Sequence, residues 1–100
     1  MLNPIQHLNK AFENKVRLGI MSLLMIHEEL EFTRIKELLQ LTDGNLASHS
    51  RALESAGYVE VEKSFVGRKP NTLYRATKAG RSAFQQHLDA LEVLIRQGRD

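Results

Sequence analysis

The sequence has no cysteine and no apolar run long enough to span a membrane. Without cysteine the chain has no disulfide bond, no thiolate metal site and no cysteine nucleophile. A transmembrane helix needs about 20 consecutive apolar residues. The N-terminal residues 1–15 also lack the apolar core of a signal peptide. These absences predict a cytoplasmic protein that has no membrane partner.

The residue patterns of enzymes are missing as well. We find no nucleophile–base–acid set, no glycine-rich phosphate loop and no metal-ligand spacing. The four histidines are scattered along the chain, at His7, His27, His49 and His87. The sequence therefore predicts no catalysis, no metal site and no cofactor.

The chain does contain a concentration of positive charge in one region. Its 100 residues, 42% of them hydrophobic, are typical of a single globular domain. The net charge is only +2, but residues 58–81 hold six basic and two acidic side chains, a local net charge of +4. Such a local excess attracts polyanions even when the whole chain is nearly neutral.

Apolar spacing and capping residues predict five helices and one hairpin. The second helix is apolar nearly all round, which is typical of a buried central helix. Gly57 is expected to end the fourth helix, and Phe32 to begin or form a very short strand. The helices are expected to begin near Pro4, Asn14, Thr33, Thr42 and Thr77, with Thr33, Thr42 and Thr77 as N-caps.

A hairpin is predicted after Gly57, because apolar and polar residues then alternate as they do in a strand. The segment Gly67-Arg68-Lys69-Pro70 is expected to form its turn, and Leu73–Ala76 its return strand. The fold class is therefore α+β, mainly α: a winged helix-turn-helix domain with a two-stranded β-wing. We expect one domain over residues 1–100, with the winged-helix core at 14–81 and outer helices at 4–13 and 82–97.

Three segments resemble one known family, the winged-helix transcriptional regulators of the ArsR and MarR classes. NKVRLGIMSLL (14–24) is similar to their first core helix, and residues 41–63 resemble their turn, recognition helix and first wing strand. Residues 66–84 resemble the rest of the wing, and the resemblance covers residues 14–85. It implies a protein that binds double-stranded DNA, with the recognition helix in the major groove and the basic wing on the backbone or minor groove.

The sequence departs from the family pattern at two points. Family members usually have leucine where this chain has Ser50. Its hydroxyl either bonds to a partner, for which the backbone carbonyl of Leu46 is the candidate, or weakens the packing of the helix. The metal-sensing branch of the ArsR class uses cysteine or His/Asp clusters, which are absent here. That absence argues against metal sensing.

The candidate base contacts lie at the start of the recognition helix, because its N-terminal turns enter the groove first. Gly44 allows close approach of the backbone, Asn45 can pair with adenine, and Ser48 can donate or accept. Asp43 either accepts from cytosine or only stabilises the positive end of the helix dipole. The predicted base contacts are Asp43, Gly44, Asn45 and Ser48.

The candidate phosphate contacts come from three places: the wing, the recognition helix and the helix before it. Lys63 could flank the path of the DNA backbone, but Glu60 and Glu62 are close to it in sequence. His49 is either a partly buried imidazole or a phosphate contact, and Thr33 is a cap first and a phosphate contact second. The predicted backbone contacts are Thr33, Arg34, Thr42, His49, Arg51, Arg68, Lys69 and Arg75.

The two outer helices carry apolar stripes that favour a homodimer. The stripe on the last helix continues past the point where a winged-helix domain needs cover, and an exposed apolar strip is a liability in a monomer. A two-fold dimer would match a palindromic operator with half-sites one turn apart. The predicted interface residues are Ile5, Leu8, Phe12, Phe84, Leu88, Leu91 and Ile95.

These observations predict a dimeric, sequence-specific transcriptional regulator. Repression is favoured because nothing in the sequence resembles a separate activation module. A small-molecule effector could sit between the dimer helices and the wing domain, but no set of residues points to one. The alternative is a winged-helix module that binds other proteins and not DNA.

Overall fold

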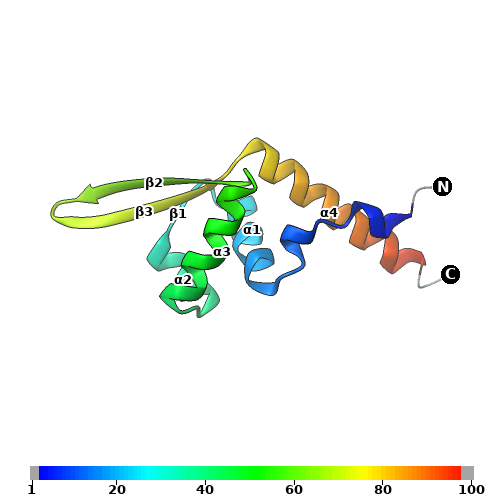
Figure 1. The fold of residues 1–100 in the computed structure, drawn as a ribbon, viewed down its shortest axis with the longest axis horizontal. Helices are drawn as coiled ribbons and strands as arrows, with labels where there is room; N and C mark the ends of the chain where they lie inside the picture. Colours follow the sequence, from blue (N-terminus) through cyan, green and yellow to red (C-terminus); the bar gives the residue numbers. More distant parts are fainter. Residues whose placement is uncertain (1–2, 98–100) are drawn as a thin grey trace.

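The computed structural model describes residues 3–97 and shows a mainly helical chain with one small antiparallel sheet (Figure 1). The three strands are arranged in the order β1-β3-β2. Two short 3-10 helices, η1 and η2, precede the four α-helices. The elements are η1 (Pro4–His7), η2 (Lys10–Phe12), α1 (Lys15–Ile26), β1 (Leu30–Glu31), α2 (Phe32–Leu39), α3 (Asp43–Ser55), β2 (Val59–Val66), β3 (Lys69–Ala76) and α4 (Lys78–Gln97).

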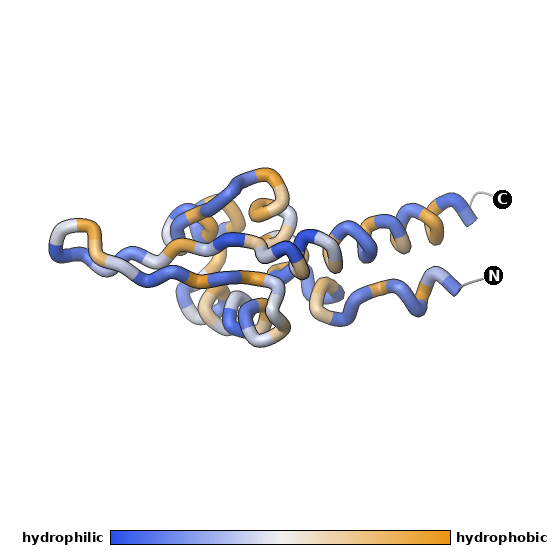
Figure 2. Tube along the Cα trace, turned by 90° about the horizontal axis from the view of Figure 1, so that it is seen from above, coloured by the Kyte–Doolittle hydropathy of each residue, from blue (hydrophilic) through white to orange (hydrophobic). Residues whose placement is uncertain are grey.

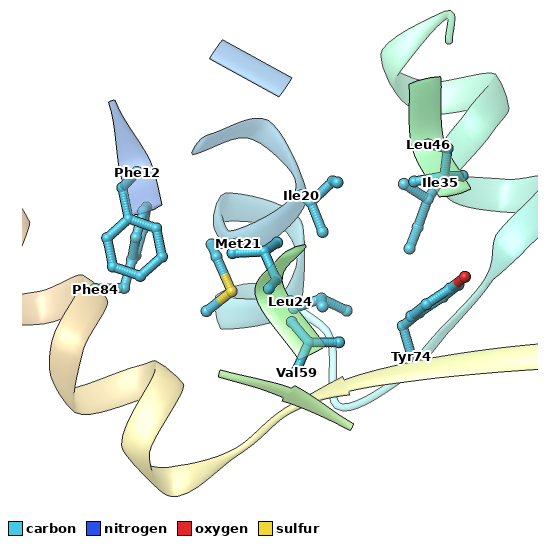
Figure 3. Close-up of a cluster of buried hydrophobic side chains, with 10 residues drawn as sticks. Phe12, Ile20, Met21, Leu24, Ile35, Leu46, Val59, Tyr74 and Phe84 are labelled. Carbon is cyan, nitrogen blue, oxygen red and sulfur yellow. The ribbon is translucent and has the colours of Figure 1, made fainter. Parts of the chain in front are cut away.

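Helix α1 lies at the centre of the hydrophobic core, as its all-round apolar sequence predicts. Ile20, Met21 and Leu24 are fully buried, and Figure 3 shows side chains from the other elements packed around them. Burial of each such side chain stabilises the fold by roughly 1.5–3 kcal/mol. The surrounding core residues are Phe12, Ile35, Leu46, Leu53, Val59, Tyr74 and Phe84.

Two of the three predicted threonine caps are present. The Thr42 hydroxyl accepts a hydrogen bond from the Asn45 N–H at 3.1 Å, and the Thr77 hydroxyl accepts from the Gly80 N–H at 2.9 Å. The prediction for Thr33 is wrong. Helix α2 already begins at Phe32, so Thr33 lies inside its first turn and caps nothing.

The expected early strand also lies slightly elsewhere. Strand β1 consists of Leu30 and Glu31, which pair with Tyr74 and Leu73 of β3. Phe32 follows it as the first residue of α2. The strand therefore ends where the helix begins, and Phe32 turns its ring toward Tyr74, with the ring centroids 6.3 Å apart.

The hairpin of β2 and β3, residues 59–76, is the wing, and it is longer than predicted. Its turn consists of Gly67 and Arg68 alone, with Gly67 in the left-handed region at φ 66°. Lys69 and Pro70 belong to β3 and pair with Val66 and Phe65. Proline is tolerated there because β3 has a neighbouring strand on one side only at that point.

The N-terminal segment is not the helix predicted for residues 4–13. It forms η1 and η2, separated by Leu8 and Asn9 in extended conformations. Asn9 causes the break: its side chain caps the Ala11 N–H, and its own N–H donates to His87 Nδ1 at 2.9 Å. Side-chain hydrogen bonding of this kind competes with helix formation.

Helix α4 is continuous from Lys78 to Gln97, so the boundary predicted between residues 81 and 82 falls inside a helix. Its start is fixed on the body of the domain by two adjacent residues. Gly80 packs so closely that a β-carbon there would lie 2.1 Å from the Tyr58 carbonyl oxygen. Arg81 donates to the carbonyls of Leu24 and Met25 at the end of α1, where a cation is favourable.

Two extensions leave the body in opposite directions, giving the chain a length of 57 Å (Figures 1 and 2). One is the wing. The other, which we call the arm, consists of η1 and residues 86–97 of α4, which lie side by side (Figure 2). The two ends of the described chain lie together at the far end of the arm (Figure 1).

Candidate nucleic-acid interface

Helix α3 divides its residues between the core and an exposed face. Leu46, Ser50 and Leu53 are buried against the body. The predicted base contacts all lie on the exposed face, at Asp43, Gly44, Asn45 and Ser48. A β-carbon at Gly44 would meet no atom within 4 Å. The leading turn of α3 therefore presents a small, open and mainly polar surface.

Asp43 has a partner that the sequence analysis did not predict. Its carboxylate lies 2.7 Å from the ammonium group of Lys36 in α2. This contact joins the end of α2 to the start of α3 across the turn. It favours the structural interpretation of Asp43, in which the carboxylate stabilises the N-terminus of α3.

Ser50 is buried, and its partners differ from the one expected. Its hydroxyl lies 3.3 Å from the Ala47 carbonyl and 3.4 Å from the Tyr74 hydroxyl, so the predicted contact with Leu46 is wrong. Tyr74 comes from β3 and is itself buried. A polar residue is accepted at this core position because a second hydroxyl meets it.

A notch of about 280 Å³ lies between α3 and the wing, next to this pair of hydroxyls. Arg51 and Glu54 line it from α3, and Lys63 and Thr72 line it from the wing. Arg51 is exposed, as a phosphate contact requires.

His49 has a structural role in this chain. It is half-buried, and its Nδ1 lies 3.2 Å from Nη1 of Arg17 in α1. The same guanidinium donates through Nε to the Ala11 carbonyl at 2.6 Å. Of the two interpretations left open for His49, this geometry favours the partly buried imidazole over the phosphate contact.

At the start of α2, Thr33 and Arg34 are both exposed. Arg34 lies 3.4 Å from Glu37, one turn along the same helix. An exposed pair of this kind contributes little to stability. The guanidinium can leave it for a phosphate at little cost.

The wing separates its charged groups along its length. Arg68 and Lys69 are exposed near the tip, and within residues 3–97 neither forms an ion pair. Phe65 and Val66 are exposed beside them, at 73% and 67%. The tip therefore carries both unpaired cations and apolar side chains.

Arg75, at the root of the wing, is engaged within the protein. Its guanidinium lies 2.7 Å from the Glu29 carboxylate and 3.5 Å from that of Glu62. The hydrogen bond to Glu29 is the main cause that raises the pKa of Arg75 above its ordinary value. These contacts favour a structural role for Arg75 over the predicted phosphate contact.

The residues predicted for a dimer interface fall into two groups. Phe12 and Phe84 lie in the core of the single chain, with ring centroids 5.1 Å apart, so their assignment to an interface is wrong. Leu8 and Leu91 are half-buried. The remaining three stay exposed on the arm, together with Val93, which the sequence analysis missed: Ile5 (61%), Leu88 (37%), Val93 (41%) and Ile95 (59%).

A buried histidine joins the N-terminal segment to α4. His87 accepts from the Asn9 N–H through Nδ1, and the Asn9 side chain donates to the Tyr58 hydroxyl at 2.9 Å. Burial lowers the pKa of His87 below its ordinary value, although the carboxylate of Glu13 acts in the opposite direction. The sequence indicated neither role, since His87 and Asn9 are 78 positions apart.

Within residues 3–97, no three side chains of histidine, aspartate or glutamate are grouped closely enough to hold a metal ion. In that same part of the chain, no helix combines the length and apolarity needed to cross a bilayer.

Comparison with known proteins agrees with this arrangement of helix and wing. The family model described as "Winged helix DNA-binding domain" matches residues 16–95. An uncharacterised protein of Methanocaldococcus jannaschii, MJ0432, is 42% identical over 79 residues, which cover 79% of this chain and 86% of the relative.

Solved structures show the same similarity over nearly the whole chain. A transcriptional regulator homologue from Pyrococcus horikoshii OT3 is 35% identical and superimposes with a TM-score of 0.87, covering 99% of both chains. A putative MarR-family regulator from Enterococcus faecalis shares the fold at 24% identity, with a TM-score of 0.68 over 89% of this chain and 76% of that one. These matches confirm the predicted winged-helix fold, and the chain belongs to the family of winged-helix DNA-binding domains.

Proposed function

We propose that the protein is a sequence-specific, dimeric transcriptional regulator that binds double-stranded DNA and acts as a repressor. The observation that carries this proposal is the pairing of two surfaces on one side of the core. The leading turn of α3 is small, polar and open. The wing beside it ends in the cations Arg68 and Lys69, which form no ion pair with residues 3–97.

In this proposal α3 lies in the major groove of the duplex. Asn45 and Ser48 reach the base edges, because the first turns of a recognition helix enter the groove deepest. An amide side chain such as that of Asn45 can pair with adenine through two hydrogen bonds. Gly44 leaves room for the backbone of α3 to approach the bases.

The phosphate backbone is held on both sides of α3. Arg51, Arg68 and Lys69 are exposed cations that can neutralise phosphates. Thr33 and Arg34, at the start of α2, lie where the preceding helix of a helix-turn-helix crosses the backbone. The Thr42 hydroxyl already caps α3, so the backbone of that turn would make the predicted contact with a phosphate.

The arm supports the dimeric part of the proposal. Four apolar side chains on it are exposed in the single chain: Ile5, Leu88, Val93 and Ile95. Apposition of two arms would bury them and would place two copies of α3 on the same duplex. A two-fold protein of this kind reads a palindromic operator. By covering the groove and the adjacent backbone, it would exclude other proteins from that site.

One observation favours a second function, that of a protein-binding module. Phe65 and Val66 expose their apolar side chains at the wing tip, and exposed apolar groups are typical of protein contact sites. Minor-groove-binding proteins also carry apolar side chains at their tips. The presence of these two residues is therefore compatible with either function, and DNA binding decides between them.

Selection of bound duplexes from a random pool, followed by titration of the winning sequence, tests the proposal. We expect a palindromic consensus and an affinity that falls by roughly a thousandfold from about 50 to about 200 mM salt if about six phosphates are neutralised. No detectable binding to any duplex at low salt would reject the regulator and leave the protein-binding module.

A further inference from the structure

The two faces of the wing differ in charge. Residues that pair across the hairpin share a face, and successive residues of a strand alternate between faces. Lys63 pairs with Thr72, and Val61 with Tyr74, so these four lie on the face that borders the notch beside α3. Glu60 and Glu62 lie on the opposite face of β2.

The opposite face also holds Arg75, whose guanidinium contacts the Glu62 carboxylate. Arg75 pairs with Glu60 in the ladder and lies 3.5 Å from the Glu62 carboxylate. The acidic groups that are close to Lys63 in sequence are therefore directed away from it. Their carboxylates do not oppose an anion that approaches Lys63 from the side of α3.

The notch offers cations from two elements and a hydroxyl between them. Arg51 lines it from α3, and Lys63 and Thr72 line it from the wing. Within residues 3–97, none of these three side chains makes a hydrogen bond or an ion pair with the protein. Glu54 also lines the notch, so the two cations leave it with a net positive charge.

From this arrangement we infer that the notch between α3 and the wing binds one phosphate of the DNA backbone, held by Arg51, Lys63 and the Thr72 hydroxyl. The inference rests on the proposed DNA-binding function and deepens it. When α3 occupies the major groove and the wing tip reaches the neighbouring backbone, one strand of the duplex passes between them. Of the two wing residues expected to flank the DNA backbone, Lys63 then makes the contact, and Arg75 stays paired with Glu29 and Glu62.

Exchange of two neighbouring residues gives a matched test. The double variant Lys63→Ser/Ser64→Lys moves the ammonium group to the outer face, since Ser64 pairs with Asn71 on that side. Composition, net charge and strand length do not change, and both positions are exposed. Binding is measured by fluorescence anisotropy on the selected duplex over a series of salt concentrations.

We expect the exchanged variant to bind as weakly as Lys63→Ser alone. Because the dimer loses one contact in each protomer, its affinity should fall by about sixtyfold at about 0.1 M salt, and the salt slope should fall by about 1.8, which is the value of two phosphate contacts. Wild-type affinity in the exchanged variant would overturn the inference, because the ammonium group would then have the same effect on either face of the wing. Failure of the wild-type protein to bind any duplex would instead reject the proposed function, and the inference with it.

A second set of variants tests whether Arg51 and Lys63 share a phosphate. One of them, Arg51→Gln, leaves the hairpin unchanged. Arg51→Gln, Lys63→Ser and their combination form a double-mutant cycle on the same duplex. If one phosphate is shared, the combined loss of affinity should be clearly smaller than the product of the two single losses. Losses that multiply would show two independent contacts and would overturn the single-phosphate site.

Discussion

The wing and the arm extend from opposite ends of one core, and both expose apolar side chains, but they differ in charge (Figures 1 and 2). The wing carries cations near its tip that form no ion pair within residues 3–97. The arm exposes apolar side chains such as Leu88 and Ile95. An extension with unpaired cations suits a polyanion, whereas an apolar one is suited to contact with another apolar surface.

The two extensions are also held to the core in different ways. The wing is a ladder of backbone pairs, and its root is fixed by the contacts of Arg75 with Glu29 and Glu62. The arm is held by side chains, among them the hydrogen bond between Asn9 and His87. Changes of side chain should therefore loosen the arm more readily than the wing.

The largest effect is expected at Gly80, where both extensions meet the core. Gly80→Ala would place a β-carbon 2.1 Å from the carbonyl oxygen of Tyr58, at the start of the wing. Because backbone atoms cannot yield easily, we expect the free energy of unfolding to fall by about 3 kcal/mol. Chemical denaturation followed by circular dichroism measures this loss.

Gly44→Ala is the matched control for Gly80. Its new β-carbon would meet no atom within 4 Å, and alanine is the better helix former by about 1 kcal/mol. Stability should therefore be unchanged or slightly higher. Equal losses at the two glycines would mean that close packing at Gly80 is not what fixes α4.

The next largest effect is expected for substitutions on the arm. Leu88→Glu combined with Ile95→Glu would bring two charges into the proposed dimer contact, where they would be buried without partners. We expect the dimer to dissociate at least about a hundredfold more readily, which corresponds to about 2.7 kcal/mol. Sedimentation velocity should show a monomer at concentrations where the wild-type protein is dimeric.

Ile26→Glu serves as the control for this pair. Ile26 is 79% exposed at the end of α1, outside the arm. It should leave the dimer intact. A wild-type protein that sediments as a monomer at micromolar concentration would remove the dimer from the proposal, and the arm would then need another partner.

Substitutions at the wing tip should have a somewhat smaller effect than those on the arm. Arg68→Ala combined with Lys69→Ala removes two phosphate contacts from each protomer, so the affinity of one protomer for any half-site duplex should fall by about sixtyfold at about 0.1 M salt, with a salt slope lower by about 1.8. The ranking of preferred sequences should stay the same, because phosphate contacts carry no base information. A repeat of the duplex selection with the variant checks both points.

Lys10→Ala with Lys15→Ala changes the net charge by the same amount outside the wing. This control should bind almost as the wild type does. If it weakens binding as much as the wing-tip pair, the overall charge and not the wing would explain the affinity.

The sequence predicted the framework well, because periodicity and caps are local signals. Thr42 and Thr77 begin their helices as expected, and Gly57, at φ 81°, follows the end of α3. The N-terminal helix was a wrong prediction, because the break at Asn9 depends on His87, a residue far along the chain. Local patterns contain no information about such a partner.

The roles of individual charges were harder to predict for a related reason. Arg75 looked available because its partner Glu29 is 46 positions away. Lys63 looked compromised because Glu60 and Glu62 are near in sequence, although the alternation of the strand places them on the other face. The alternation of a strand can be read from the sequence, but the pairing of Arg75 with Glu29 becomes visible only in the folded chain.

The smallest effect concerns pH and belongs to the arm. Burial lowers the pKa of His87, whereas in the unfolded chain a histidine has its ordinary pKa of about 6.5. As the pH falls through about 6.5, the unfolded chain therefore binds a proton that the folded chain does not. Stability is fully present above that pH, decreases as the pH falls, and levels off below the folded pKa of His87.

Thermal unfolding at about pH 7 and about pH 5 measures this dependence, with His87→Gln and His27→Gln as a matched pair. Glutamine at position 87 keeps an oxygen that can accept from the Asn9 N–H but has no proton to bind, so the variant should lose less stability on acidification than the wild type. His27 is exposed beyond the end of α1, and its replacement should leave the dependence unchanged. If His87→Gln remains as sensitive to acid as the wild type, protonation of His87 is not the cause of the loss of stability.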